Sequence, residues 1–86
     1  MIRDYDFYVE APINKVKRAL QNLAYELEYE SFWDIAADVY TAQPFFGESN
    51  GTVVNLQSVA LDLAFEVQEF LEENFGFVEE LNGAII

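Results

Sequence analysis

The chain has 86 residues, a net charge of −12, and neither cysteine nor histidine. This composition excludes a disulfide framework, a thiolate metal site and a histidine general base. Hydrophobic residues make up 52% of the chain and aromatic residues 16%. We therefore expect residues 1–86 to fold as a single compact acidic domain and not as a disordered acidic tail.

The N-terminal third predicts a β-strand followed by a helix. Tyr5, Phe7 and Val9 alternate with polar neighbours, which is the period of a half-buried strand. Pro12 suits the first turn of a helix because its φ angle is fixed near the helical value. We expect a helix over about residues 12–28, because an apolar stripe at helical spacing runs through Ile13, Val16, Leu20, Leu23, Ala24 and Leu27.

A second helix is expected over about residues 31–42. Ser31 and Asp34 resemble a capping box at its start. Its apolar stripe is rotated by roughly 130° from the first, so one straight helix could not bury both. The alternative rests on residues 24–30, whose strict alternation suits a strand and would give a β-α-β-type sandwich. The second stripe consists of Phe32, Ile35, Ala36, Val39 and Tyr40.

The remaining chain predicts a loop, a long helix and a short strand. Residues 43–51 contain Pro and Asn-Gly turn signals, and we expect Phe45 and Phe46 to plug the core from this loop. Apolar residues at helical spacing predict a central helix over about residues 53–75, with Gly76 as its stop signal. A short C-terminal strand beside the N-terminal one completes the expected fold, which is α+β and mainly helical.

The distribution of charge is the feature that points to a function. From Ala19 to Ile86 the chain carries thirteen acidic residues and no basic one. Soluble domains ordinarily mix both signs, and a surface of one sign destabilises the compact state through self-repulsion. The negative charge disfavours nucleic acid and anionic membranes as direct partners and favours a basic protein. All four basic residues lie within the first 18 positions, at Arg3, Lys15, Lys17 and Arg18.

Two acidic sets and one tryptophan are the candidate partner-binding residues. On the expected central helix, four carboxylates fall within roughly 60° of each other along roughly 16 Å: Asp62, Glu66, Glu69 and Glu73. A second set has a constant spacing of four, although the expected break near residue 30 divides it into pairs: Glu26, Glu30, Asp34 and Asp38. Trp33 is a candidate aromatic anchor, and core packing is the slightly favoured alternative for its ring.

These features predict a non-enzymatic protein inhibitor that uses no cofactor and no metal. Its acidic surface would mimic the phosphate charge of DNA and block a DNA- or RNA-binding protein. The chain is similar in size and charge to phage- or plasmid-encoded anti-defence proteins, namely anti-CRISPR proteins, anti-restriction proteins and inhibitors of uracil-DNA glycosylase. The alternative is an acidic adaptor or subunit that binds a basic protein without competing with nucleic acid.

Other classes of function have weaker support in the sequence. An enzyme working through paired carboxylates would need a deep pocket around them, and a calcium loop needs oxygen ligands at alternate positions, a spacing absent here. The N-terminus lacks the pattern of a signal peptide. Since no uncharged apolar run approaches the roughly 18 residues of a membrane span, we expect a cytoplasmic protein without a membrane partner.

Overall fold

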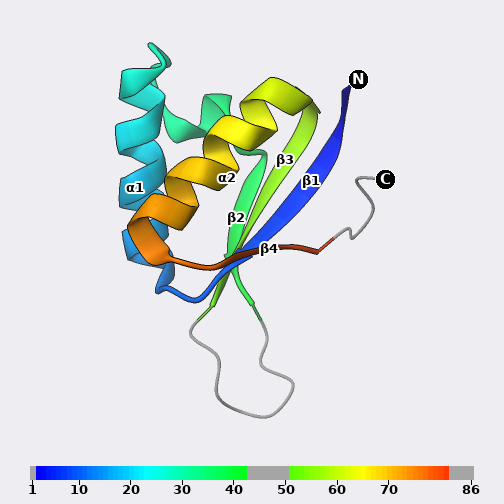
Figure 1. The fold of residues 1–86 in the computed structure, drawn as a ribbon. Coiled ribbons are helices and arrows are strands. Elements are labelled where there is room, and N and C mark those ends of the chain that lie inside the picture. Colours follow the sequence, from blue (N-terminus) through cyan, green and yellow to red (C-terminus); the bar gives the residue numbers. More distant parts are fainter. Residues whose placement is uncertain (1, 43–50, 82–86) are drawn as a thin grey trace.

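A four-stranded antiparallel sheet forms one layer of the molecule, and two helices form the other (Figure 1). The computed structural model describes residues 2–42 and 51–81. The strands lie in the order β2-β3-β1-β4, and every neighbouring pair is antiparallel. Together with the element order, this is the ferredoxin-like β-α-β-β-α-β topology. The elements are β1 (Ile2–Val9), α1 (Ile13–Glu26), the 3₁₀ helix η1 (Phe32–Asp34), β2 (Asp38–Thr41), β3 (Thr52–Ala60), α2 (Leu61–Phe75) and β4 (Val78–Glu80).

The expected N-terminal strand is confirmed as β1, one of the two inner strands of the sheet. Tyr5, Phe7 and Val9 are almost fully buried, and they face the two helices. At Asp4 the pairing with β3 contains a bulge, where Ser58 adopts a left-handed φ of 55°. The Asp4 carboxylate accepts the Ser58 backbone N–H at 2.9 Å, so this acidic residue stabilises the irregular part of the ladder.

The first helix is also confirmed, with bounds close to those expected. It ends in a Schellman motif, in which Glu28 takes a left-handed φ of 67° and the Tyr29 N–H donates to the Ala24 carbonyl at 2.8 Å. The alternative strand over residues 24–30 is therefore wrong. Because Ala24 is fully buried against the core, the alternating pattern of this segment reflects a helix end followed by a turn.

The helix expected over residues 31–42 is wrong. Its capping box forms, because Ser31 accepts the Trp33 N–H and Asp34 accepts the Ser31 N–H, both at 3.1 Å. The turn that follows is only the 3₁₀ helix η1. The chain then extends into β2, where Val39 is buried between the sheet and the helices. The run Val39 to Thr41 is β-branched and aromatic and favours a strand once a partner strand lies beside it.

The long central helix is wrong in its first half. Residues 52–60 form β3, and the helix α2 begins only at Leu61. β3 pairs with β1 on one side and β2 on the other. Val53 and Val54 are both buried although they point to opposite faces of the sheet. On the open face Val53 is buried, but Asn55 and Gln57 are progressively more exposed. The bulge opposite Asp4 then shifts the alternation before Val59, so the segment does not show one uninterrupted period of two. Since residues 52–60 are a strand and not a helix, the fold is not mainly helical.

The short C-terminal strand lies beside β1, as the sequence indicated: Tyr8 pairs with Glu79 and Val9 with Val78. Gly76 ends α2 with a positive φ of 86°. The expected loop around residues 43–50, with Phe45 and Phe46 as core plugs, lies outside the described residues.

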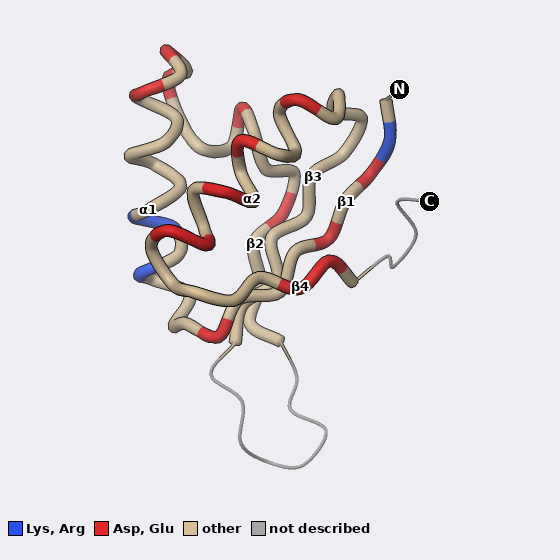
Figure 2. The backbone as a smooth tube through the Cα atoms, viewed as in Figure 1, with Lys and Arg blue, Asp and Glu red and all other residues tan. Residues whose placement is uncertain are grey.

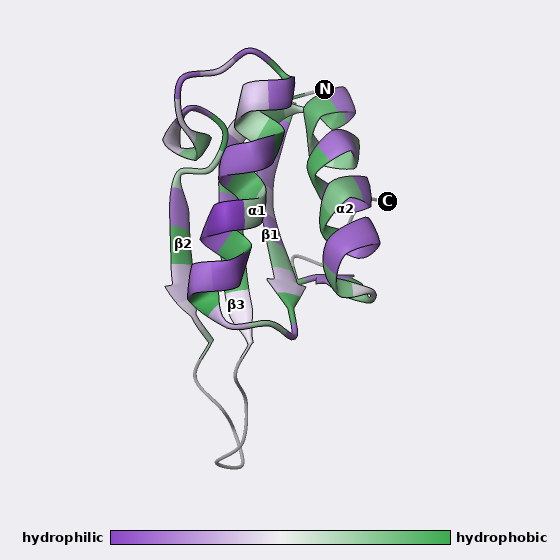
Figure 3. Cartoon of the chain, turned by 90° about the vertical axis from the view of Figure 1, so that its left-hand side faces the viewer, coloured by the Kyte–Doolittle hydropathy of each residue, from purple (hydrophilic) through white to green (hydrophobic). Residues whose placement is uncertain are grey.

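The core fills the space between the sheet and the two helices. Figure 3 shows the hydrophobic stripes of α1 and α2 turned inward and their hydrophilic sides turned outward. α2 packs over β1, β3 and β4, whereas α1 packs against α2 and β2. Within residues 2–42 and 51–81, no element covers the opposite face of the sheet, which we call the open face.

Candidate partner-binding surfaces

The four carboxylates predicted on the central helix lie together on α2. We call this set the α2 row: Asp62, Glu66, Glu69 and Glu73. All four are exposed. The buried side of the helix carries Ala64, Val67 and Leu71, which lie on the opposite side of the helical wheel from the row. The row therefore points away from the sheet into solvent.

The α2 row does little for the helix that carries it. Asp62 lies in the first turn, where the helix dipole favours an acid, but Glu73 lies in the last turn, where it does not. Each like-charge pair one turn apart costs roughly 0.2–0.5 kcal/mol. Since no lysine or arginine occurs after Arg18, α2 contains no ion pair to offset this repulsion.

One apolar side chain interrupts the acidic side of α2. Phe65 is 47% exposed. Together with Asp62, Glu66 and Glu69 it lines an open depression of about 350 Å³. Aromatic side chains dominate the binding energy of protein interfaces, so Phe65 gives the row an apolar contact that nucleic acid itself lacks.

The second acidic set is not a row. Glu26 is the last residue of α1, Glu30 lies in the turn after it, Asp34 caps η1, and Asp38 begins β2. The constant spacing of four has no geometric meaning, because only the first of the four is in an α-helix.

Trp33 lies on the surface, and the core alternative for its ring is wrong. The side chain is 52% exposed and packs against the Phe32 ring, with centroids 4.4 Å apart. The Lys17 ammonium lies 6.0 Å from the Trp33 centroid, at the limit of a cation–π contact. Because its neighbour Phe32 is buried, η1 holds the tryptophan in place while leaving one side of the ring to solvent.

The open face carries a second acidic surface that sequence reasoning missed. Register places Tyr40, Val53, Tyr8 and Glu79 in one row across the sheet, and Asp38, Asn55 and Asp6 in the next. The Asn55 amide donates to the Asp6 carboxylate at 2.5 Å. The alternation of residues 4–10 was a usable signal, since the residues between the buried aromatic ones include Asp4, Asp6 and Tyr8.

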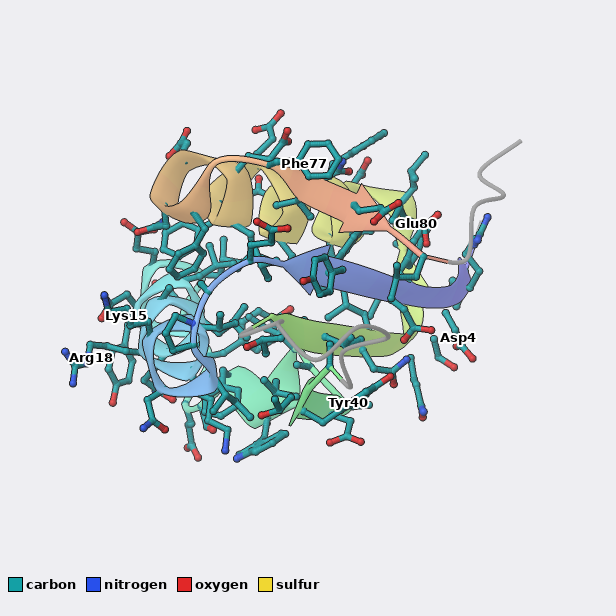
Figure 4. The ribbon with its side chains drawn as sticks, turned by 90° about the horizontal axis from the view of Figure 1, so that it is seen from below. Asp4, Lys15, Arg18, Tyr40, Phe77 and Glu80 are labelled. Atoms are coloured by element: carbon teal, nitrogen blue, oxygen red, sulfur yellow. The ribbon has the colours of Figure 1, made fainter. Side chains whose placement is uncertain are left out.

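Positive charge lies in two places, on α1 and at Arg3 near the start of β1. Figure 2 shows basic residues only on α1 and near the N-terminal end of β1. Lys15 and Arg18 project from α1 on one side of the molecule, and Asp4 lies on the other (Figure 4). The Arg3 guanidinium lies 4.8 Å from the centroid of the Tyr5 ring, on the helix-covered face of the sheet. No basic residue lies on α2, β2, β3 or β4.

The described part of the chain contains no cluster of three or more acidic residues arranged to hold a metal ion. Neither of its helices has the length and apolar character that crossing a membrane requires.

The fold and these surfaces define a small acidic α+β protein whose carboxylates lie on two opposite sides. A scan of protein-family models finds no match to this chain, and searches of the curated proteins and of the solved structures find no significant match.

Proposed function

We propose that this protein is a non-enzymatic inhibitor that occupies the basic nucleic-acid-binding surface of a DNA- or RNA-binding protein. The observation that carries the proposal is the α2 row, four exposed carboxylates on one side of a helix with no basic residue among them. The row weakens its own helix, so a binding role explains it better than stability does.

The geometry of the row suits a phosphate-binding groove. Glu73 lies eleven positions after Asp62, which is about 16 Å at 1.5 Å per residue, or roughly one charge per 5.5 Å. One strand of duplex DNA carries one phosphate per roughly 3.4 Å of axis. The row is therefore about two-thirds as dense in charge as a single strand. The same electrostatic attraction that steers nucleic acid to a basic groove would steer α2 to it.

The class of inhibitor follows from size and charge. Small acidic proteins that block nucleases and DNA-repair enzymes are encoded by phages and plasmids as anti-defence factors. We therefore place the targets among CRISPR effector nucleases, restriction enzymes and uracil-DNA glycosylases.

The first prediction tests the row against these targets. Purified enzymes of the three classes are assayed for DNA binding by fluorescence anisotropy, with and without the protein. At least one is expected to release DNA. The variant Asp62→Asn with Glu66→Gln, Glu69→Gln and Glu73→Gln should inhibit at least about fourfold less well, because exposed ion pairs contribute about 0.2–1 kcal/mol each. Its inhibition should also depend less steeply on salt.

A matched control separates the row from overall charge. Glu10, Glu26, Glu28 and Glu30 are all exposed, and changing these four to Gln removes the same charge away from α2. This variant should keep most of the inhibition. If the two variants inhibit the affected enzyme equally well, the α2 row is not the binding surface.

An acidic adaptor or subunit is the second candidate, and the exposed aromatic rings favour it. Trp33 is half exposed and Tyr25 is 64% exposed, and such rings suit any protein interface whether or not DNA competes for it. Competition decides between the two: excess duplex DNA should displace an inhibitor of the proposed kind from its partner and should leave an adaptor bound.

A further inference from the structure

The strand β2 is an edge of the sheet, with β3 on one side only. The Ala42 N–H donates to the Gly51 carbonyl opposite it at 2.9 Å. In an antiparallel ladder, alternate residues make the bonds to the neighbouring strand, so Tyr40 pairs with β3 in the same way. The residues between, Val39 and Thr41, then turn their backbone N–H and C=O groups away from β3. Such an edge is a template for one further strand.

The side chains beside this edge are acidic and aromatic. Asp38 and Tyr40 lie on the open face, and Tyr40 is 45% exposed. Alternate residues of a strand are roughly 6.8 Å apart. An added strand with cationic residues at alternate positions would therefore bring one cation to the Asp38 carboxylate and the next to the Tyr40 ring, where a cation–π contact is available.

The rest of the open face adds to this attraction. Asp6 on β1 lies two strands away from β2, roughly 10 Å at the usual strand spacing. Asn55, on the intervening strand β3, donates a hydrogen bond to the Asp6 carboxylate. Among the described residues, the bases lie on α1 and on the helix-covered side of β1. The described part of the open face therefore carries no cation that would repel a basic ligand.

We propose that the β2 edge, Asp38–Thr41, binds an extended Lys- or Arg-rich segment of a partner protein as a fifth strand of the sheet. The backbone of β2 supplies the hydrogen bonds, and Asp38 and Tyr40 select for cationic side chains. Flexible basic arms of nucleic-acid-binding proteins have this chemistry. The site is independent of the α2 row, which faces the other side of the molecule. A second copy of this chain would bring acid against acid.

The second prediction uses a short fluorescein-labelled peptide with arginine alternating with threonine, and a control peptide with glutamate in place of arginine. The arginine peptide alone should bind. Asp38→Asn should weaken binding about threefold, in line with one exposed ion pair. Thr41→Pro removes an outward N–H without removing a bond to β3 and should weaken binding at least tenfold, whereas Thr41→Val keeps that N–H and should bind like the wild type.

Hydrogen exchange followed by NMR gives a readout that charge alone cannot produce. The amides of Val39 and Thr41 should exchange rapidly in the free protein and become protected with the arginine peptide. Glu72→Gln is the matched control for charge, because Glu72 is exposed on α2 outside the α2 row, and it should leave peptide binding unchanged. Circular dichroism establishes that each variant is folded.

Several outcomes would overturn the β2 site. They are failure of the arginine peptide to bind, equal weakening by Glu72→Gln and Asp38→Asn, or no added protection at Val39 and Thr41. Protection of these amides that rises with protein concentration alone would assign the edge to a second copy. If the wild-type protein binds the arginine peptide but inhibits none of the three enzyme classes, the result would instead count against the proposed function of the α2 row only.

Discussion

At the scale of single residues, Thr52 has the most demanding environment in the described core. It is the only buried polar side chain there, with 0% exposure. Its hydroxyl donates to the Ala11 carbonyl at 2.7 Å. This bond ties the start of β3 to the connection between β1 and α1, so one side chain fixes where the first helix leaves the sheet.

The third prediction follows from this hydrogen bond. Thr52→Val keeps the shape of the side chain but leaves the Ala11 carbonyl buried without its partner. A buried group left unsatisfied costs about 1–3 kcal/mol, so the free energy of unfolding in urea should fall by about 1–2 kcal/mol. Thr41→Val changes an exposed position and should shift stability by less than about 0.5 kcal/mol. Equal effects of the two substitutions would show that the hydroxyl of Thr52 contributes nothing specific.

At the scale of elements, the C-terminal end of α1 contains a strained backbone conformation. Glu28 occupies the left-handed position of the Schellman motif, where glycine is the usual residue. A left-handed conformation costs an L-residue about 1–2 kcal/mol. The bonds from Glu28 and Tyr29 to the last carbonyls of the helix compensate for part of this strain.

The fourth prediction relieves that strain. Glu28→Gly should raise the free energy of unfolding by about 0.5–1 kcal/mol, since glycine's greater freedom in the unfolded chain offsets part of the gain. Glu30→Gly removes the same charge two residues later and should give no gain, because Glu30 is not left-handed. Urea denaturation of both variants at one ionic strength checks this, and a stabilising Glu30→Gly would assign the effect to charge.

The sequence predicted the elements that have one clear apolar side. In β1, apolar residues recur with the period of a strand, and in α1 and the second half of the predicted central helix they recur with the period of a helix. The sequence therefore identifies the buried residues of these three elements. β3 could not be recognised, because the bulge opposite Asp4 interrupts its alternation and Val59 continues smoothly into the apolar stripe of α2. β2 was assigned to a helix because Val39 happens to lie at helical spacing from Phe32 and Ile35, although all three are buried for different geometric reasons.

Of the two candidate surfaces, one could be predicted from the sequence and the other could not. The α2 row was predictable, since its four residues are local to one helix and only that helix had to be correct. The open face depends on pairing between β2, β3 and β1, which are distant in sequence. Asp38 was considered for the wrong surface, and Tyr40 was assigned to a core stripe although it lies exposed at the sheet edge.

At the scale of the whole molecule, charge is segregated rather than mixed. The acids lie on the outer side of α2, around η1 and on the open face, and the bases lie mainly on α1 (Figure 2). With a net charge of −12, every acidic side chain lies in a negative field that compaction strengthens. A basic partner would relieve this field on either acidic side, so binding and stability are expected to be linked.

The fifth prediction concerns that field. Salt screens repulsion between exposed charges, since the Debye length falls from roughly 30 Å at 0.01 M to roughly 10 Å at 0.1 M ionic strength. The urea midpoint of the free protein should therefore rise with sodium chloride over this range. Changing the α2 row to its amides lowers the net charge from −12 to −8 and should make the rise shallower. If stability instead falls with salt, attraction between α1 and the acidic residues outweighs repulsion, and the acidic surfaces do not need a partner to offset their charge.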